Sequence, residues 1–124
     1  MHNDLSQDFE KYLSNTRQLI NSELATFLSD TSELRLQPLI EYALLSNGKR
    51  LRSTLVILCA QSVGRNCGQV MSLARAFELL HTATLIHDDI IDGDDMRRGI
   101  PAIHKKWDIN SAILVGDALI SLAI

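Results

Sequence analysis

Five aspartates and two arginines lie close together in one segment of the chain, His87-Asp88-Asp89-Ile90-Ile91-Asp92-Gly93-Asp94-Asp95-Met96-Arg97-Arg98-Gly99. Asp88 and Asp92 are four residues apart, so on a helix they project from the same face, one turn apart. Two carboxylates at that separation repel each other unless a cation lies between them. Mg²⁺ characteristically uses one or two carboxylates together with waters and substrate phosphates. The segment therefore predicts a site for Mg²⁺ and a diphosphate, with Asp88 and Asp92 as metal ligands.

The surrounding sequence favours this interpretation over a solvated helix end, which is the commoner meaning of an acidic run. The acids follow an apolar helical stretch from Phe77 to Ile86, and Gly93 ends the helix just beyond them, so the arginines lie on a turn that can fold back. Arginine can donate forked hydrogen bonds to phosphate oxygens. We therefore expect the arginines to share the anion site.

A second basic cluster lies upstream, at Gly48-Lys49-Arg50-Leu51-Arg52. Lys49 and Arg52 are three residues apart and share one face beside a predicted helix start. Positive charge at a helix start is unfavourable for the helix dipole, so these two side chains are expected to bind an anion. Arg50 points elsewhere and is interpreted as a surface or salt-bridging residue.

The sequence from Gly48 to about Leu119 resembles the front half of an all-trans isoprenyl diphosphate synthase of the polyprenyl synthetase family. The resemblance rests on four blocks in the same order: GKRLR at 48–52, ELLHTATLIHDDIID at 78–92, DMRRG at 95–99 and VGD at 115–117. One departure is Ser53, where the family usually has proline. Both residues are common at helix starts, so we expect little effect.

The resemblance implies a Mg²⁺-dependent prenyltransferase and a role for each matching residue. In such an enzyme an allylic diphosphate loses its diphosphate, and the double bond of isopentenyl diphosphate attacks the resulting cation. By resemblance, Arg97 holds the allylic diphosphate. The residues implied to hold the diphosphate of isopentenyl diphosphate are Lys49, Arg52, His81 and Arg98. The sequence contains no Ser/His/Asp or Cys/His arrangement, and this reaction needs no side-chain nucleophile.

The residues before the first aspartate bear on product length. Ala83 and Thr84 are small and lie one turn before Asp88, where short-chain members of the family tend to carry aromatic rings. A growing tail could then pass along the same helix towards Leu80 and Phe77. Phe77 lies about 16 Å down the helix axis from Asp88, so we expect a product of at least twenty carbons.

The remaining polar residues of interest receive plainer interpretations. Asp89 points about 100° away from Asp88 on a helix and is expected to pair with a basic residue. Asp94 and Asp95 are expected to be solvated loop acids. His87 and His104 are interpreted as satisfied packing residues rather than ligands.

Composition excludes several classes of protein. With a hydrophobic content of 46% and a net charge of −3, nothing indicates nucleic acid or an anionic membrane surface as a partner. The most apolar window, Ile109 to Ile124, is short for a transmembrane helix and carries Asp117, which needs a partner if buried. Cys59 and Cys67 lack metal-type spacing and no secretory signal precedes them, so reduced thiols and a cytoplasmic location are expected.

The few prolines and glycines and the lack of strand-type alternation predict an all-α protein, and the resemblance implies an antiparallel helical bundle of the isoprenoid synthase type. A cap for the second helix is expected at Thr31 or Ser32, and 93–103 is expected to be a polar loop. The predicted helices are 4 to about 27, 34–45, 50 or 51 to 63, 68 or 69 to 92, and from Asp108 or Asn110 onwards.

The last predicted helix stops at Ile124 without a glycine, proline or basic closing turn, and chains of the family are far longer. We therefore expect residues 1–124 to be the N-terminal portion of a single synthase domain, inactive alone and prone to self-association, for example as a homodimer. A non-catalytic or regulatory subunit with the same fold is one alternative. A terpene-forming enzyme is another, disfavoured because only a chain-elongating enzyme needs a second diphosphate site such as 48–52.

Overall fold

The computed structural model describes residues 2–31, 34–46 and 48–124, and most of these residues are helical, as predicted. Two short strands and one 3₁₀ turn, η1 (Cys67–Gln69), complete the fold. The helices are α1 (His2–Asp30), α2 (Gln37–Leu44), α3 (Leu51–Ser62), α4 (Met71–Asp92), α5 (Ile103–Lys106) and α6 (Ile109–Ala123). The strands are β1 (Met96–Arg97) and β2 (Ile100–Pro101).

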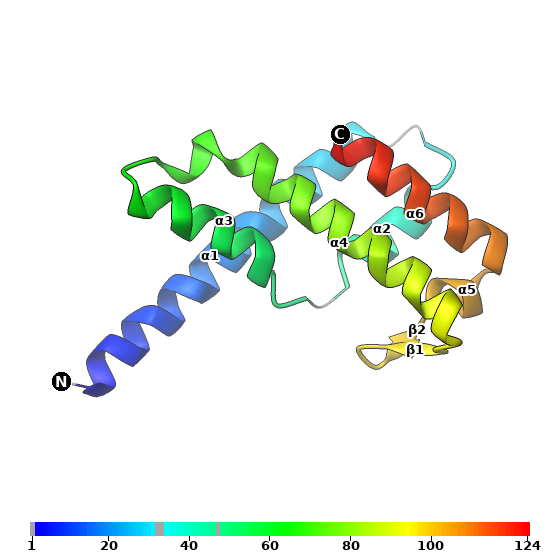
Figure 1. The fold of residues 1–124 in the computed structure, drawn as a ribbon, viewed down its shortest axis with the longest axis horizontal. Coiled ribbons are helices and arrows are strands. Elements are labelled where there is room, and N and C mark those ends of the chain that lie inside the picture. The colour runs from blue at the N-terminus through cyan, green and yellow to red at the C-terminus, as the bar shows by residue number, and fades with distance from the viewer. Residues whose placement is uncertain (1, 32–33, 47) are drawn as a thin grey trace.

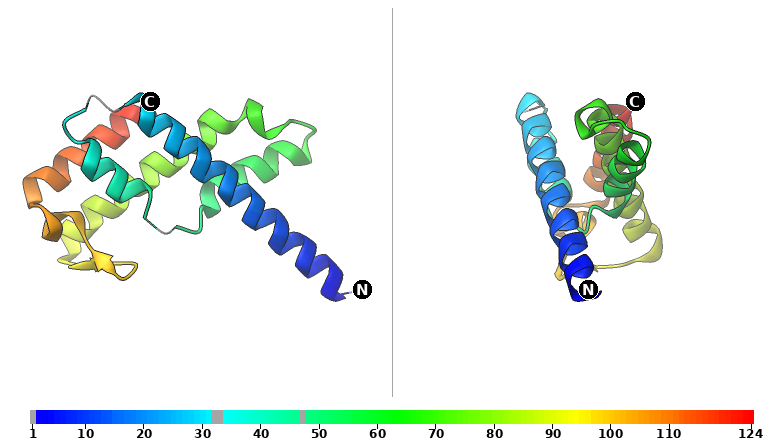
Figure 2. Two further views of the ribbon diagram at one scale, coloured as in Figure 1. Left: turned by 180° about the vertical axis from the view of Figure 1, so that it is seen from behind. Right: turned by 90° about the vertical axis from the view of Figure 1, so that its left-hand side faces the viewer.

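Helix α4 is the centre of the fold, because it contacts α1, α2, α3, α5 and α6 (Figure 1). The N-terminal end of α1 extends away from the other helices (Figure 2). No helix within the described residues is long and apolar enough to cross a membrane. Because α4 contacts these five helices, its side chains and its C-terminal end are the parts of the fold best placed to form a functional site.

Two apolar clusters hold the helices together. The larger cluster joins α2, α4 and α6 through side chains such as Ile40, Leu79 and Leu119. The smaller cluster joins α1, α3 and the start of α4 through Ile20 and Ile57. Burial of these side chains supplies most of the stabilisation of the fold.

Helices α4 and α6 approach each other closely at Gly116. A Cβ atom at this position would lie only 2.1 Å from Nε2 of His87. The His87 ring packs against the backbone of α6 at Gly116, which has no side chain. Its Nε2 lies 3.2 Å from the carbonyl oxygen of Ile113. Helix α6 begins as predicted, because the carboxylate of Asp108 accepts a hydrogen bond from the backbone N–H of Ser111 (2.7 Å).

The predicted start of the second helix is wrong. Helix α1 continues to Asp30, and α2 begins only at Gln37, after Leu36, whose side chain cannot accept a hydrogen bond. The Nε2–H of Gln37 donates to the carbonyl oxygen of Leu28 (2.7 Å) and so ties the end of α1 to the start of α2. Thr31 donates to that same carbonyl instead of capping α2. The alternative cap, Ser32, lies outside the described residues.

Residues 93–103 are not the featureless loop that the sequence predicts. Strands β1 and β2 pair in an antiparallel ribbon closed by Arg98 and Gly99, whose φ angles are +52° and +81°. Positive φ at both central residues is the pattern of a type I′ hairpin turn, in which the second residue is usually glycine. The Tyr42 hydroxyl donates to the carbonyl oxygen of Pro101 (2.8 Å) and holds this hairpin against α2.

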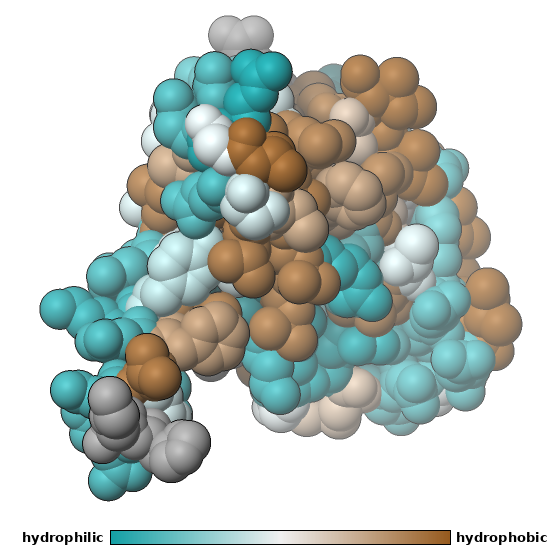
Figure 3. Space-filling view, turned by 60° about the vertical axis from the view of Figure 1, so that its left-hand side comes forward, coloured by the Kyte–Doolittle hydropathy of each residue, from teal (hydrophilic) through white to brown (hydrophobic). Residues whose placement is uncertain are grey.

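Apolar side chains also gather over a broad area of the surface (Figure 3). Helices α3, α4 and α6 all contribute large exposed apolar residues. They include Leu55, Leu58, Leu73, Phe77, Leu80, Ile113 and Leu114.

The neighbouring leucines at 79 and 80 allow a matched test of this core. Leu79 is 0% exposed and Leu80 is 40% exposed. We expect Leu79→Ala to lower the free energy of unfolding by about 2–5 kcal/mol, because it leaves a cavity. Leu80→Ala should change it by about 0.5 kcal/mol or less. Urea unfolding followed by circular dichroism measures both, and equal losses would show that α4 buries a different face.

Candidate functional site

A cavity of about 940 Å³ lies where α1, α3, α4 and the hairpin turn meet, and its lining is mainly basic. Glu78 is the single acidic residue of this lining in the part of the chain that the structure describes. An excess of positive charge in the lining of a cavity attracts anions. The basic residues that line it are Arg17, Lys49, Arg50, Arg52, His81 and Arg98.

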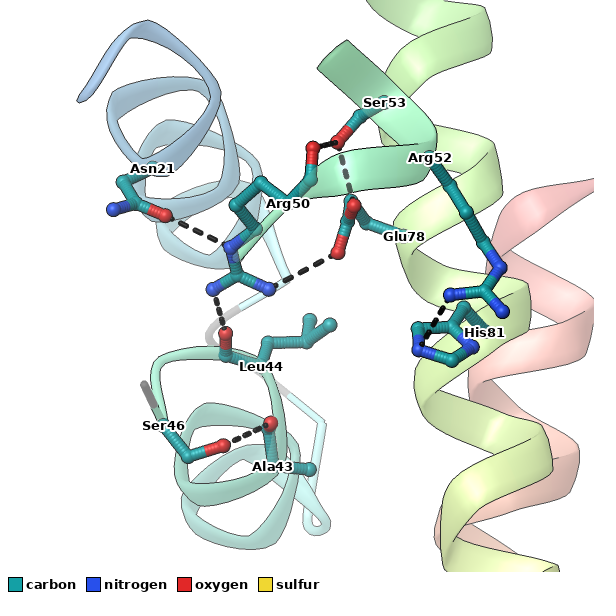
Figure 4. Close-up of polar contacts among 9 residues, drawn as sticks. All are labelled: Asn21, Ala43, Leu44, Ser46, Arg50, Arg52, Ser53, Glu78 and His81. Atoms are coloured by element: carbon teal, nitrogen blue, oxygen red, sulfur yellow. Dashed lines mark hydrogen bonds and ion pairs between the residues drawn. The ribbon is translucent and has the colours of Figure 1, made fainter. Parts of the chain in front are cut away.

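Arg50 and Glu78 form a buried ion pair at the base of this cavity, with Nη1 and Oε2 3.1 Å apart (Figure 4). Only 6% of Arg50 is exposed, so it is a salt-bridging residue as predicted but not a surface one. The Ser53 hydroxyl donates to the other carboxylate oxygen of Glu78 (2.5 Å). A proline at position 53 could not make this contact, so the departure from the family pattern is used by the fold.

Arg52 and His81 meet at the wall of the cavity, with Nη1 and Nε2 3.0 Å apart. Because a guanidinium can only donate, Nε2 accepts and the histidine proton lies on Nδ1. Burial, and then the nearby charge of Arg52, lowers the pKa of His81 below its usual value of about 6.5. His81 is therefore neutral at pH 7 while the cavity holds no anion.

Arg98 reaches the same cavity from the hairpin turn. Its Nη1 lies 2.9 Å from the point where a Cβ atom on Gly48 would stand, so a side chain at position 48 would displace the guanidinium. Burial, followed by the charges of Arg50 and Arg97, lowers the pKa of Arg98. The structure thus gathers Lys49, Arg52, His81 and Arg98 around one cavity.

Arg97 lies on the other side of the hairpin, paired with Asp89. Its Nε–H and Nη2–H donate to the two carboxylate oxygens of Asp89 at 2.8 and 2.6 Å. The prediction that Asp89 pairs with a basic residue is confirmed, and Asp89 is only 3% exposed. The hydrogen bond to Asp89 raises the pKa of Arg97. Arg97 does not line the basic cavity, and its remaining Nη1 group can still donate to a ligand.

Asp88 and Asp92 lie exposed at the C-terminal end of α4, which ends at Asp92 as predicted. Neither forms an ion pair within residues 2–31, 34–46 and 48–124. The same residues contain no group of three or more His, Cys, Asp or Glu side chains arranged to hold a metal. Two oxygen donors one turn apart fit Mg²⁺, which takes its other ligands from waters and phosphates.

The neighbouring acids and histidines differ in part from expectation. Asp95 is exposed but lies 3.4 Å from Lys105 Nζ, while Asp94 is an exposed loop acid as predicted. Asp117 needs no buried partner, because its side chain is 63% exposed, and its basic neighbour is His87 at 3.7 Å. His104 was expected to be satisfied, yet its buried Nδ1 has no hydrogen-bond partner among the described residues.

Comparison with known proteins identifies the family. The sequence pattern of the polyprenyl synthetase family matches residues 33–124. The chain belongs to this family.

Relatives in the family carry informative names. The chain is 43% identical over 111 residues to the geranylgeranyl diphosphate synthase of Methanosarcina mazei, covering 90% of this chain and 34% of that protein. It is 38% identical over 123 residues to geranylgeranyl pyrophosphate synthase 9, chloroplastic, of Arabidopsis thaliana, covering 98% and 34%. The chain thus spans about a third of the length of these relatives. Because one of them is chloroplastic by name, the cytoplasmic location stays a prediction.

Solved structures give the same result for the fold. The crystal structure of a geranyltransferase from Legionella pneumophila superimposes with a TM-score of 0.87 and 36% sequence identity, covering 94% of this chain and 42% of that chain. The prediction of an all-α bundle of the isoprenoid synthase type is therefore confirmed.

The four residues predicted to control product length do not all lie on one face of α4. Phe77, Leu80 and Thr84 are exposed on the face that also carries Asp88. Ala83 differs, because its side chain is fully buried in the larger apolar cluster. The structure thus corrects the placement of Ala83: a larger residue there would first disturb the core.

The lowered pKa of His81 predicts a pH-dependent stability. The folded state binds the proton less tightly than the unfolded state, so the free energy of unfolding should fall as the pH drops from about 6.5 towards the lower folded-state pKa. Above pH 6.5 this contribution is fully present. His81→Gln should remove this part of the pH dependence, and Arg52→Gln should reduce it.

Urea unfolding between pH 5 and 7.5 measures the effect as a difference between each variant and the wild type. Taking the difference cancels the titration of carboxylates that the variants share. Identical pH dependence in the wild type and His81→Gln would contradict the electrostatics described for this wall.

Proposed function

We propose that residues 1–124 are the N-terminal portion of an all-trans polyprenyl diphosphate synthase domain and supply one metal-binding wall and the isopentenyl diphosphate site. One observation carries the proposal: Lys49, Arg52, His81 and Arg98, from three separate segments, surround one cavity beside the helix that ends in Asp88 and Asp92. Spacing along α4 supports it, because His81 and Asp88 are seven residues, or about 10 Å, apart along the axis. That interval accommodates a five-carbon unit between two diphosphates.

In this proposal the cavity binds and orients isopentenyl diphosphate. Lys49, Arg52 and Arg98 neutralise the diphosphate oxygens. His81, neutral in the free protein, accepts a proton more readily once the anion offsets the charge of Arg52. The five-carbon group then points along α4 towards its acidic end.

At that end Asp88 and Asp92 would hold Mg²⁺. When bound, the metal acts as a Lewis acid that stabilises the charge developing on the departing allylic diphosphate. Arg97 would add a donor to the same diphosphate through Nη1, since Asp89 already holds its other two donor groups in place. Exposed apolar residues of α4 line the path for the hydrocarbon tail and help to keep water from the cation.

The coverage of the relatives supports a longer enzyme, in which the rest of the site comes from sequence beyond residues 1–124. The apolar surface of α3, α4 and α6 supports burial against further protein, including a second copy in a homodimer. A non-catalytic subunit would need neither the basic cavity nor the aspartates at the end of α4. The presence of both on this chain, side by side, favours a catalytic role.

Substitution of the acids tests the metal site. In the complete enzyme, Asp88→Asn or Asp92→Asn should reduce Mg²⁺-dependent incorporation of labelled isopentenyl diphosphate by about a hundredfold or more, because stabilisation of the leaving group is lost. Asp94→Asn is the matched control and should leave turnover within about twofold. Circular dichroism checks that helix content is unchanged. Equal losses at all three positions would show that the ligand register is misplaced.

Substitution along α4 tests the path of the product. Thr84→Phe should shorten the main product by at least one five-carbon unit, since the ring would stand on the exposed face one turn from Asp88. Ala83→Phe should instead lower the melting temperature, because it overpacks the core. Product chromatography and thermal melts read out the two effects. An unchanged product with Thr84→Phe, or a wild-type product of fifteen carbons, would rule out this path.

A further inference from the structure

Arg50 stands between Lys49 and Arg52 in the chain but does not act as they do. Its backbone has φ +54° and ψ +34°, a left-handed conformation that residues other than glycine adopt only when other contacts hold them there. This residue immediately precedes α3, and its carbonyl oxygen accepts the first helical hydrogen bond from Thr54 (3.0 Å). The strained turn therefore sets the direction from which Lys49 and Arg52 enter the cavity.

The side chain of Arg50 is hydrogen-bonded to three helices, α1, α2 and α4 (Figure 4). Its Nε–H donates to Oδ1 of Asn21 on α1 (2.9 Å), its Nη1–H to Glu78 on α4 (3.1 Å), and its Nη2–H to the carbonyl oxygen of Leu44 on α2. Arg50 itself is the residue immediately before α3. The contacts that hold the left-handed turn in place thus come from three other helices.

These contacts leave Arg50 poorly placed to bind a ligand directly. All three nitrogens of its guanidinium donate to protein groups, and Glu78 offsets its charge. Glu78 is occupied in turn by Ser53 and is only 3% exposed. The pair is an internally neutral unit beneath a basic cavity.

We propose that Arg50 is a positioning residue for the diphosphate cavity and that Asn21, which lines the cavity from α1, holds Arg50 in place. Arg50 fixes the turn that presents Lys49 and Arg52, and Asn21 fixes Arg50. Asn21 lies outside the part of the chain that the family pattern matches, residues 33–124. The inference rests on the proposed function, because it assumes that the cavity binds a diphosphate.

Asn21→Leu is the sharpest test, since it releases Arg50 without changing any charge near the cavity. Tyr12→Phe is the matched control: it removes a hydrogen bond between α1 and α3, from the Tyr12 hydroxyl to Gln61 Oε1 (2.6 Å), outside the cavity lining. Isothermal titration with inorganic pyrophosphate measures binding in each protein. We expect Asn21→Leu to weaken binding about fivefold and Tyr12→Phe to leave it within about twofold.

Arg50→Lys provides an independent second variant. Lysine keeps the positive charge but cannot direct a planar fork at three acceptors. We expect it to weaken pyrophosphate binding at least as much as Asn21→Leu. If Arg50→Lys bound pyrophosphate like the wild type, Arg50 would act through charge alone and the proposal would be wrong. Should this variant fail to fold, the comparison between Asn21→Leu and Tyr12→Phe decides the matter by itself.

A purely structural role would lower stability without this selective effect. In the complete enzyme, Asn21→Leu should therefore raise KM for isopentenyl diphosphate about fivefold and leave KM for the allylic substrate within about twofold. If wild-type protein bound pyrophosphate and Asn21→Leu matched Tyr12→Phe, the positioning role would fall while the proposed function stood. If wild-type protein did not bind pyrophosphate, the proposed function would fall, and this inference with it.

Discussion

Repulsion between like charges is the constraint on which the rest of this structure depends. Lys49, Arg52 and Arg98 converge beside His81 on one cavity, although the charges of the lysine and the two arginines oppose such an arrangement. The effect is visible in the lowered pKa values of His81 and Arg98, to which nearby arginines contribute after burial. Cations held together before a ligand arrives need not be reorganised when it binds, which favours tight and oriented binding of an anion.

The rigid frame for these charges is α4. One helix carries His81 in the basic wall, Glu78 beneath it, and Asp88 and Asp92 at its end. Because a helix fixes the rise and rotation between residues, the separation between the basic and acidic sites follows directly from the sequence spacing. The flanking helices then need only hold α4 in place and bring Lys49 and Arg52 to it. This division accounts for the central position of α4 in the fold.

Much of the site could be predicted because it depends on local spacing. The helix end at Asp92 follows from the glycine at position 93, and the pairing of Asp89 follows from helical periodicity. The inward direction of Arg50 could not be predicted, because it depends on Asn21 and Glu78, which are distant in sequence. Whether a side chain such as Arg50 points inwards depends on its burial, and burial is set by the packing of the whole fold.

Several features of the fold were also missed, because local sequence signals did not indicate them. The hairpin depends on a turn formed by Arg98 and Gly99, and arginine gives no usual signal for a positive φ. The start of α2 depends on a hydrogen bond from Gln37 to the end of α1 rather than on a capping residue. Ala83 faces the core because the packing of α2 and α6 selects which side of α4 is covered.

The contact between His87 and Gly116 has a consequence for chimaeric proteins in which helices are exchanged between relatives. The imidazole occupies the space where any side chain at position 116 would begin, so each helix is shaped to its neighbour. A chimaera that took α4 from one relative and α6 from another would join surfaces that were not matched. A larger residue at 116 would push the helices apart, and a smaller one at 87 would leave a gap beside the aspartates. These two helices should therefore be transplanted together, as a single interchangeable module.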